Sequence, residues 1–202
     1  MVRKLTEWWM PLAALVAFVG VGFGASVARS QPGPRYADTT SGGERQLVFI
    51  GSSSCGYANA PEMPALFEQI RRIVERSAVA DGRRFVTVGI ARDTDVGAGL
   101  AHLKKFGQFD ELLVGRSWVN TGTLKYVFGV MRGTAATPQV LVVDRLVHTE
   151  GGAFAISNEV LVKRRSGLVE LREWASGSGD PVATAGDGPL PALGTPASGP
   201  GR

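Results

Sequence analysis

The stretch Leu47-Val48-Phe49-Ile50-Gly51-Ser52-Ser53-Ser54-Cys55-Gly56-Tyr57-Ala58 decides how this chain folds. It begins with a short apolar run that has the length of a buried β-strand. A loop of small and polar residues follows and carries the only cysteine of the chain. Beyond the loop, apolar residues recur at helical spacing from Met63 to Val74, with charged residues between them. The pattern predicts a strand, a loop with a single thiol, and a helix.

The rest of the chain continues the alternation of strands and helices. Asn59 and Glu62 resemble a capping pair for the first helix, with Pro61 in its first turn. The following pattern predicts a strand over 85–90, a helix over 96–106 starting near Asp93 or Asp95, an extended piece over 109–114, a short helix over 122–130, a strand over 140–143, a paired strand over 147–156 and a last helix over 160–174. This order favours an α/β sheet with helices on both faces.

Composition limits the possible functions. The chain has 202 residues, a net charge of +4 and one cysteine, so an internal disulfide is excluded. The densest basic run is Lys163-Arg164-Arg165, which we interpret as the solvated face of a helix. No nucleic-acid footprint is predicted, because the basic residues form no longer block.

The N-terminus carries the pattern of a membrane segment. Arg3 and Lys4 precede an uncharged, apolar stretch over 8–28, which is long enough to span a bilayer as a helix. Trp8 and Trp9 suit the membrane interface, and the leading positive charges predict a cytoplasmic N-terminus. We therefore expect a single-pass anchor in the inner (cytoplasmic) membrane with the remaining domain in the periplasm. Cleavage of the stretch as a signal peptide after Ala28 is the alternative.

These features divide the chain into four parts. Residues 1–28 form the anchor or signal, and residues 29–43 form a polar linker with Pro and Gly. The globular domain is expected over 44–176. Residues 177–202 are rich in Gly, Pro, Ala and Ser, a composition that predicts a disordered or extended tail.

Two motifs resemble the thioredoxin-like superfamily. Phe49-Ile50-Gly51-Ser52-Ser53-Ser54-Cys55 stands where the family has its first strand and first active-site cysteine. Ala136-Thr137-Pro138-Gln139-Val140 stands where the family has its cis-proline, and Pro64 resembles the proline that kinks the first helix. The resemblance implies a thioredoxin-like central sheet, a cis bond between Thr137 and Pro138, and Cys55 beside them at the entrance of a helix, where the helix dipole favours thiolate.

The chain also departs from the family. Oxidoreductases of this superfamily use Cys-x-x-Cys, whose second thiol resolves the mixed disulfide. Here Ala58 occupies that position, so a dithiol cycle within this chain is excluded. His102 is expected on the outer face of the second helix and His148 in the late hairpin, each as a surface residue. Arg132 is a candidate partner for a peroxide-reactive thiolate by position only. No spacing of Cys and His predicts a metal, and no cofactor motif is present.

Two functions from different classes follow from the resemblance. The first is a non-catalytic accessory or structural subunit, tethered to the membrane, that binds a larger membrane protein complex such as a respiratory or photosynthetic one. Trp118, Tyr126 and Phe128 are the interface candidates, because aromatic side chains anchor many interfaces. The second is a monothiol redox protein acting through Cys55. Neither function predicts a small-molecule substrate.

Overall fold

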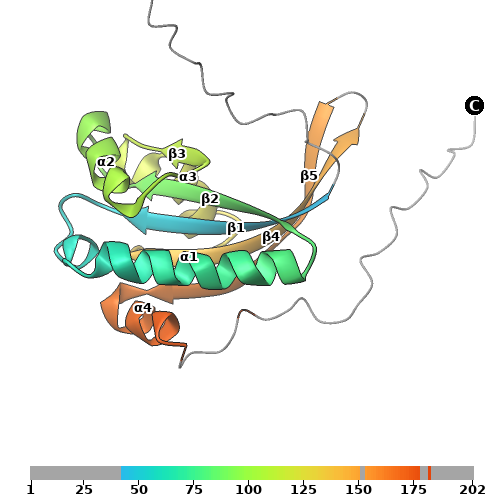
Figure 1. Ribbon diagram of the computed structural model, residues 1–202. Helices are drawn as coiled ribbons and strands as arrows, with labels where there is room; N and C mark the ends of the chain where they lie inside the picture. The colour runs from blue at the N-terminus through green and yellow to red at the C-terminus, as the bar shows by residue number, and fades with distance from the viewer. Residues whose placement is uncertain (1–41, 151–152, 178–181, 183–202) are drawn as a thin grey trace, which may run out of the picture. The chain divides into compact units, whose positions relative to one another are not determined.

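The computed structural model describes residues 42–150, 153–177 and 182 (Figure 1). These residues fall within one compact unit of the chain, 39–202. The predicted anchor with Trp8 and Trp9, and most of the expected linker, lie outside the described residues. In the part of the chain that is described, no helix combines the length and the apolar character needed to cross a membrane.

A mixed sheet of five strands forms the centre of the fold (Figure 1). Its strands lie in the order β3-β2-β1-β4-β5. The three strands on one side, β1 to β3, are parallel, and β4 and β5 run antiparallel to their neighbours. Their bounds are β1 Gly42–Gly51, β2 Arg84–Ala91, β3 Glu111–Leu113, β4 Gln139–Glu150 and β5 Ala153–Ser166. β1 begins within the expected linker.

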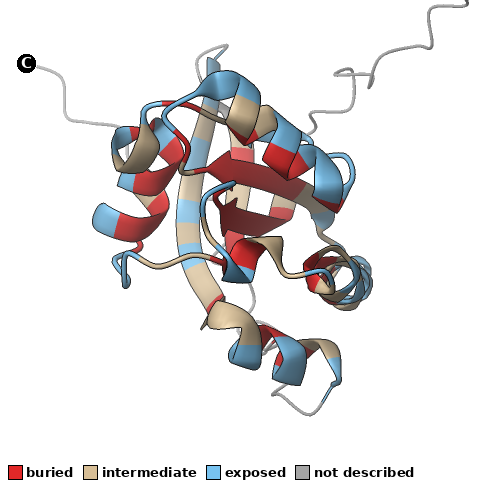
Figure 2. Cartoon of the chain, turned by 90° about the vertical axis from the view of Figure 1, so that its left-hand side faces the viewer, coloured by how far each residue is buried: buried red, intermediate tan, exposed pale blue. Residues whose placement is uncertain are grey.

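Helical segments cover both faces of this sheet. One face packs against α1 (Met63–Ala80), α2 (Val96–Leu103), the short 3-10 segment η3 (Lys104–Phe106) and α4 (Gly167–Ala175). The other face packs against a short segment made of α3 (Thr121–Thr123) and η5 (Leu124–Phe128). The central strands between these layers are buried, whereas the outer sides of the helices are exposed (Figure 2).

Successive side chains of β1 point alternately into the two cores, one on each face of the sheet. Leu47 and Phe49 point into the core beneath α1, together with Phe67 and Trp174. Val48 and Ile50 point into the opposite core. These four residues of β1 are fully buried, as expected for a central strand whose two faces are both covered.

The last helix of the fold is much shorter than the sequence predicts. Residues 160–166 belong to β5, and α4 begins only at Gly167, whose φ is +80°. The expected paired strand exists but has other bounds than 147–156, because β4 continues to Glu150 and its partner β5 begins at Ala153. Lys163-Arg164-Arg165 therefore lies on a strand and not on a solvated helix face.

The start of α1 also differs from the prediction. Its N-cap is Glu62, and the proline at its first positions is Pro64, so Pro61 precedes the helix and Pro64 does not kink it. Asn59 ends a separate 3-10 turn, η2 (Tyr57–Asn59). Its side chain caps no helix and instead bonds to the preceding loop.

Charged residues meet at the start of β1, at the opposite end of the strand from the thiol loop. Arg45 is fully buried, and its guanidinium donates to both carboxylate oxygens of Asp144 at 2.8 Å. It also lies 2.8 Å from Asp81. The hydrogen bonds with Asp144 raise the pKa of Arg45 above its usual value. A buried charge is stable only when it is paired. The pairing of Arg45 therefore connects β1, β4 and the end of α1.

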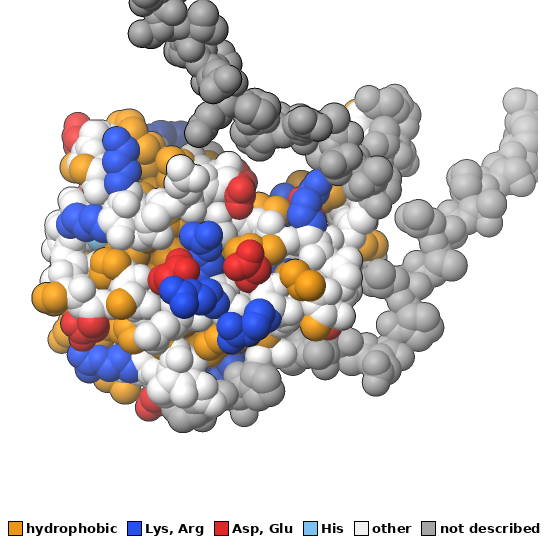
Figure 3. Space-filling view, viewed as in Figure 1, with side chains coloured by type: hydrophobic (Ala, Val, Ile, Leu, Met, Phe, Trp, Pro, Cys, Tyr) orange, Lys and Arg blue, Asp and Glu red, His pale blue; other side chains and the backbone are white. Residues whose placement is uncertain are grey.

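The outer surface of α1 carries charges of both signs. Arg72 pairs with Glu68 at 3.0 Å, and Arg71 lies 3.6 Å from the same carboxylate. Figure 3 shows Lys or Arg side chains next to Asp or Glu side chains on the face of the molecule in front of the sheet. The basic side chains on this face therefore do not form a separate stripe.

Candidate functional site around Cys55

The sheet register brings Cys55 next to Pro138. The thiol loop, Ser52 to Tyr57, begins where β1 ends. Ile50 near the end of β1 pairs with Gln139 at the start of β4, so the residues that follow β1 lie beside those that precede β4. The Thr137–Pro138 peptide bond is cis. The Sγ of Cys55 lies 3.2 Å from the carbonyl oxygen of Thr137.

The contact with Thr137 uses the thiol proton. A carbonyl oxygen only accepts hydrogen bonds, so the S–H of Cys55 is the donor. The thiol is half-buried. Ala58, at the position of a second cysteine, is only 1% exposed.

Cys55 does not lie at the entrance of a long helix. α1 starts at Met63, and only the three-residue turn η2 stands between. Because the influence of a helix dipole is limited to its first turn, α1 does not supply the thiolate stabilisation that the resemblance implied.

The side chain of Asn59 holds the thiol loop together. Its Nδ2 donates to the backbone oxygens of Ser52, Ser53 and Cys55 at 3.0, 3.0 and 2.8 Å. Its Oδ1 accepts from Lys105 Nζ at 3.0 Å. One amide thus fixes the loop and attaches it to the segment after α2.

His102 is part of the core and not a surface residue. It is 1% exposed, and its ring lies against Phe49 and Phe106. Its Nδ1 is 3.2 Å from Asn59 Oδ1. Because that oxygen accepts, Nδ1 carries the proton, and Nε2 is a buried acceptor without a partner. Burial lowers the pKa of His102, the charge of Lys105 lowers it further, and Asp93 opposes the shift.

Asp93 provides a second attachment for the loop. The backbone N–H of Ser53 lies 3.1 Å from both carboxylate oxygens of Asp93, and the Ser53 hydroxyl also donates to it. Asp93 is 7% exposed. Sequence reasoning did not assign Asn59 or Asp93 to the site. The signal for Asp93 was its place just after β2, because parallel neighbouring strands end at the same edge of a sheet.

The three predicted interface residues have different environments. Tyr126 is 2% exposed and its hydroxyl lies 3.2 Å from the Gln46 amide, so its assignment to an interface is wrong. Its burial raises the pKa of the Tyr126 phenol well above the usual value. Phe128 is 44% exposed. Trp118 is half-buried and packs edge to face against Phe128, with ring centroids 5.9 Å apart.

Arg92 connects the thiol loop to these aromatic side chains. Its Nη2 lies 3.4 Å from Ser54 Oγ, and its guanidinium carbon lies 5.0 Å from the centre of the Trp118 ring. The thiol loop and the exposed aromatic side chains are therefore at the same edge of the sheet.

The remaining candidates contribute nothing to this site. His148 is half-buried on β4, where it pairs with Ala155. Arg132 is exposed after Met131, and no contact between it and Cys55 is found within the described residues. In that same part of the chain, no group of His, Cys, Asp or Glu side chains could hold a metal ion.

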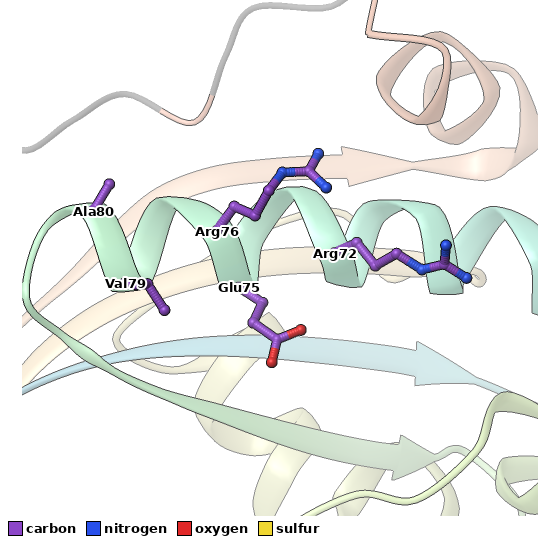
Figure 4. A pocket seen from close by; sticks show the side chains of 5 residues that line it. All are labelled: Arg72, Glu75, Arg76, Val79 and Ala80. Carbon is purple, nitrogen blue, oxygen red and sulfur yellow. The ribbon is translucent and has the colours of Figure 1, made fainter.

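A shallow depression lies on the outer surface of α1. It is lined by Arg72, Glu75, Arg76, Val79 and Ala80, all from the second half of that helix (Figure 4). Because a single helix supplies every lining residue, the depression does not enclose a ligand. It is also distant along α1 from the thiol loop, which precedes the other end of the helix.

Comparison with known proteins identifies no family. No family model matches the chain, and no curated protein matches it either. Among solved structures, a match is found to a secreted disulfide oxidoreductase of Mycobacterium tuberculosis that is homologous to E. coli DsbE. The match has 18% sequence identity and a TM-score of 0.29, and it covers 55% of this chain and 74% of the other. A likeness at this level carries no argument about function.

Proposed function

We propose that the chain is a thioredoxin-like protein-binding module without a catalytic thiol cycle. In this proposal it is an accessory subunit of a larger membrane protein complex, with residues 1–28 as its anchor and the domain in the periplasm. The observation that carries the proposal is the environment of the single thiol. The S–H of Cys55 donates to Thr137, and the second cysteine position holds the buried Ala58. Disulfide exchange needs a free thiolate and a resolving thiol.

Thiol labelling of the full chain tests the absence of catalysis. Cys55 is the only cysteine, so an alkylating reagent reports on it alone, and Cys55→Ser is the blank. We expect labelling at about pH 6 to be no faster than that of a small free thiol. Asn59→Ala should label faster than the wild type, because it releases three loop carbonyls. Rapid labelling of the wild type at this pH would contradict the proposal.

Native membranes test the accessory role. In a mild detergent extract, the full chain should migrate with a larger assembly, and Cys55→Ser should migrate with it equally well. Migration of the wild type as an isolated chain, or loss of assembly in Cys55→Ser, would count against this role. Protease added to the periplasmic side should digest the domain if the proposed orientation holds.

One observation favours a second function, monothiol exchange. Cys55 is half-buried and not fully enclosed, and it lies beside the Thr137–Pro138 backbone. In such an exchange, the Cys55 sulfur would bond to one sulfur of a partner disulfide while the other leaves as a thiolate. A small external thiol would then have to release the mixed disulfide. Glutathione disulfide is a suitable probe, and formation of a mixed disulfide within seconds would favour this second function.

A further inference from the structure

The segment between β3 and β4 exposes several apolar side chains. Val119 is 53% exposed, Leu124 47% and Phe128 44%, and the half-buried Trp118 packs against Phe128. We name these four residues the aromatic patch. Leu124 and Phe128 are four residues apart in η5 and share its outer side. The other side of the same segment buries Tyr126 and Val127 in the core.

The aromatic patch is held rigidly. The Thr123 hydroxyl lies 2.7 Å from the Trp118 carbonyl oxygen, to which it donates, and the Asn120 side chain accepts from the Thr123 N–H at 2.8 Å. From β5, Arg164 donates to the carbonyl oxygens of Tyr126 and Met131. A surface ordered before binding loses little entropy when a partner docks, so these bonds favour a binding role for the patch.

Three arginines lie close to the patch in space or along the chain. The Arg92 guanidinium lies over the Trp118 ring, Arg116 directly precedes the 3-10 turn that holds Trp118, and Arg132 follows Met131. None of these three arginines makes an ion pair within the described residues. Lys125, by contrast, is neutralised by Glu159 at 2.6 Å. The surface therefore complements a partner that carries carboxylates beside apolar side chains.

We propose that the aromatic patch binds an acidic segment of a partner protein, in which Asp or Glu residues flank aromatic or large aliphatic ones. The apolar side chains of that segment pack on Phe128 and Leu124, and its carboxylates pair with Arg92, Arg116 and Arg132. This inference rests on the proposed function as a binding module, and it adds where the partner binds and what its chemistry is.

Selection from a displayed library of random peptides of about 12 residues tests this proposal. The full chain, inserted in a lipid nanodisc, is the bait. We expect enrichment of peptides that combine Asp or Glu with Phe, Trp or Leu. Their affinity should fall about tenfold or more for the double variant Leu124→Ser with Phe128→Ser. The variant Val79→Ser with Val169→Ser removes two comparably exposed side chains elsewhere and should bind like the wild type.

A second set of substitutions tests the contribution of the three arginines to peptide binding. Replacing Arg92, Arg116 and Arg132 by Gln should weaken the selected peptides about tenfold and should flatten the dependence of their affinity on salt. Enrichment of basic peptides, no enrichment, or equal binding by the Leu124→Ser with Phe128→Ser variant would overturn the proposal. Self-association that the same double variant abolishes would identify a second copy as the occupant, which would also overturn it. Slow thiol labelling combined with any of these outcomes would leave the silent-thiol proposal standing.

Discussion

At the scale of single residues, Asn59 determines how the thiol is presented. Its amide binds three backbone oxygens of the loop and also meets Lys105 and His102. The loop is therefore held partly through a buried histidine. Neutral His102 donates to Asn59 through Nδ1, whereas a second proton on Nε2 would have no acceptor.

Acidification should reduce the stability of the folded chain through His102. The pKa of His102 is lowered from 6.5 by burial, so below this pH the unfolded chain binds a proton that the folded chain still excludes. The contribution of His102 to the free energy of unfolding is then fully present above about pH 6.5. Below that pH it falls by at most about 1.4 kcal/mol per pH unit, until the pH passes the pKa of His102 in the folded chain. Urea unfolding at about pH 8 down to about pH 5 measures this slope.

The two histidines of the chain supply the matched comparison. In His102→Gln, the free energy of unfolding should no longer begin to fall near the ordinary pKa of histidine. In His148→Gln, it should fall with pH as in the wild type. An unchanged slope in His102→Gln would assign the acid sensitivity to other groups. The sequence did not predict this behaviour, because it placed His102 on an outer helix face. The apolar residues Leu103 of α2 and Phe106 of η3 were visible in the sequence, but the core also encloses His102 beside the thiol loop.

At the scale of elements, Arg164 is one of the side chains that attach the segment over 117–134 to the sheet. Arg164 of β5 donates to Gln139 at 2.9 Å and to two carbonyl oxygens of the segment. Gly133 makes this possible, because a Cβ there would lie 2.0 Å from Arg164 Nη1. Sequence reasoning predicted a short helix over 122–130 but not its attachment, since it assigned Arg164 to a solvated helix.

Gly133→Ala should displace the Arg164 guanidinium from its three acceptors. We expect a loss of stability of about 1–3 kcal/mol, as for other insertions into a filled site, and faster hydrogen exchange over 124–131. Gly56→Ala is the control, because no atom lies within 4 Å of its Cβ position and its φ of −55° suits alanine. Equal stability of the two variants would show that Arg164 does not hold the segment.

The strands were easier to predict than the last helix, for a physical reason. The runs over 47–50 and 140–143 are apolar on both faces and the run over 85–90 nearly so, as is typical of short buried strands. The edge strand β5 carries Val160, Leu161 and Val162. In the sequence, these residues extend the helical spacing of Leu168, Leu171 and Trp174, so they are easily assigned to the same helix. These residues form a strand because they pair with β4, and the local sequence does not show which distant strand is available for pairing.

At the scale of the whole molecule, the sheet order explains why the site could be located from two motifs. β1 lies between β2 and β4, so the loops after β1 and β2 and the residues before β4 meet at one edge. The thiol loop, Asp93 and Pro138 come from these three places. The partners of the loop, by contrast, depend on side-chain contacts between distant segments, such as Asn59 with His102, which a sequence pattern does not encode.

The core also extends beyond the last helix. Val182 is 5% exposed and belongs to the core beneath α1, together with Leu171 and Trp174. Sequence analysis placed Val182 in a segment expected to be disordered or extended, and this one residue of the segment is buried. A buried valine contributes to stability wherever it lies in the chain, because burial of apolar surface is not tied to regular structure.

Val182→Ala should therefore destabilise the domain although it lies outside every helix and strand. Removing two buried methyl groups costs about 1.5 kcal/mol at the usual value per carbon, which urea unfolding of the full chain can measure. Val169→Ala makes the same change on the outer side of α4, where valine is 65% exposed, and should cost no more than about 0.5 kcal/mol. If the two variants unfold at the same urea concentration, Val182 contributes nothing to the core. Destabilisation by Val182→Ala alone would place the boundary of the folded domain beyond 176.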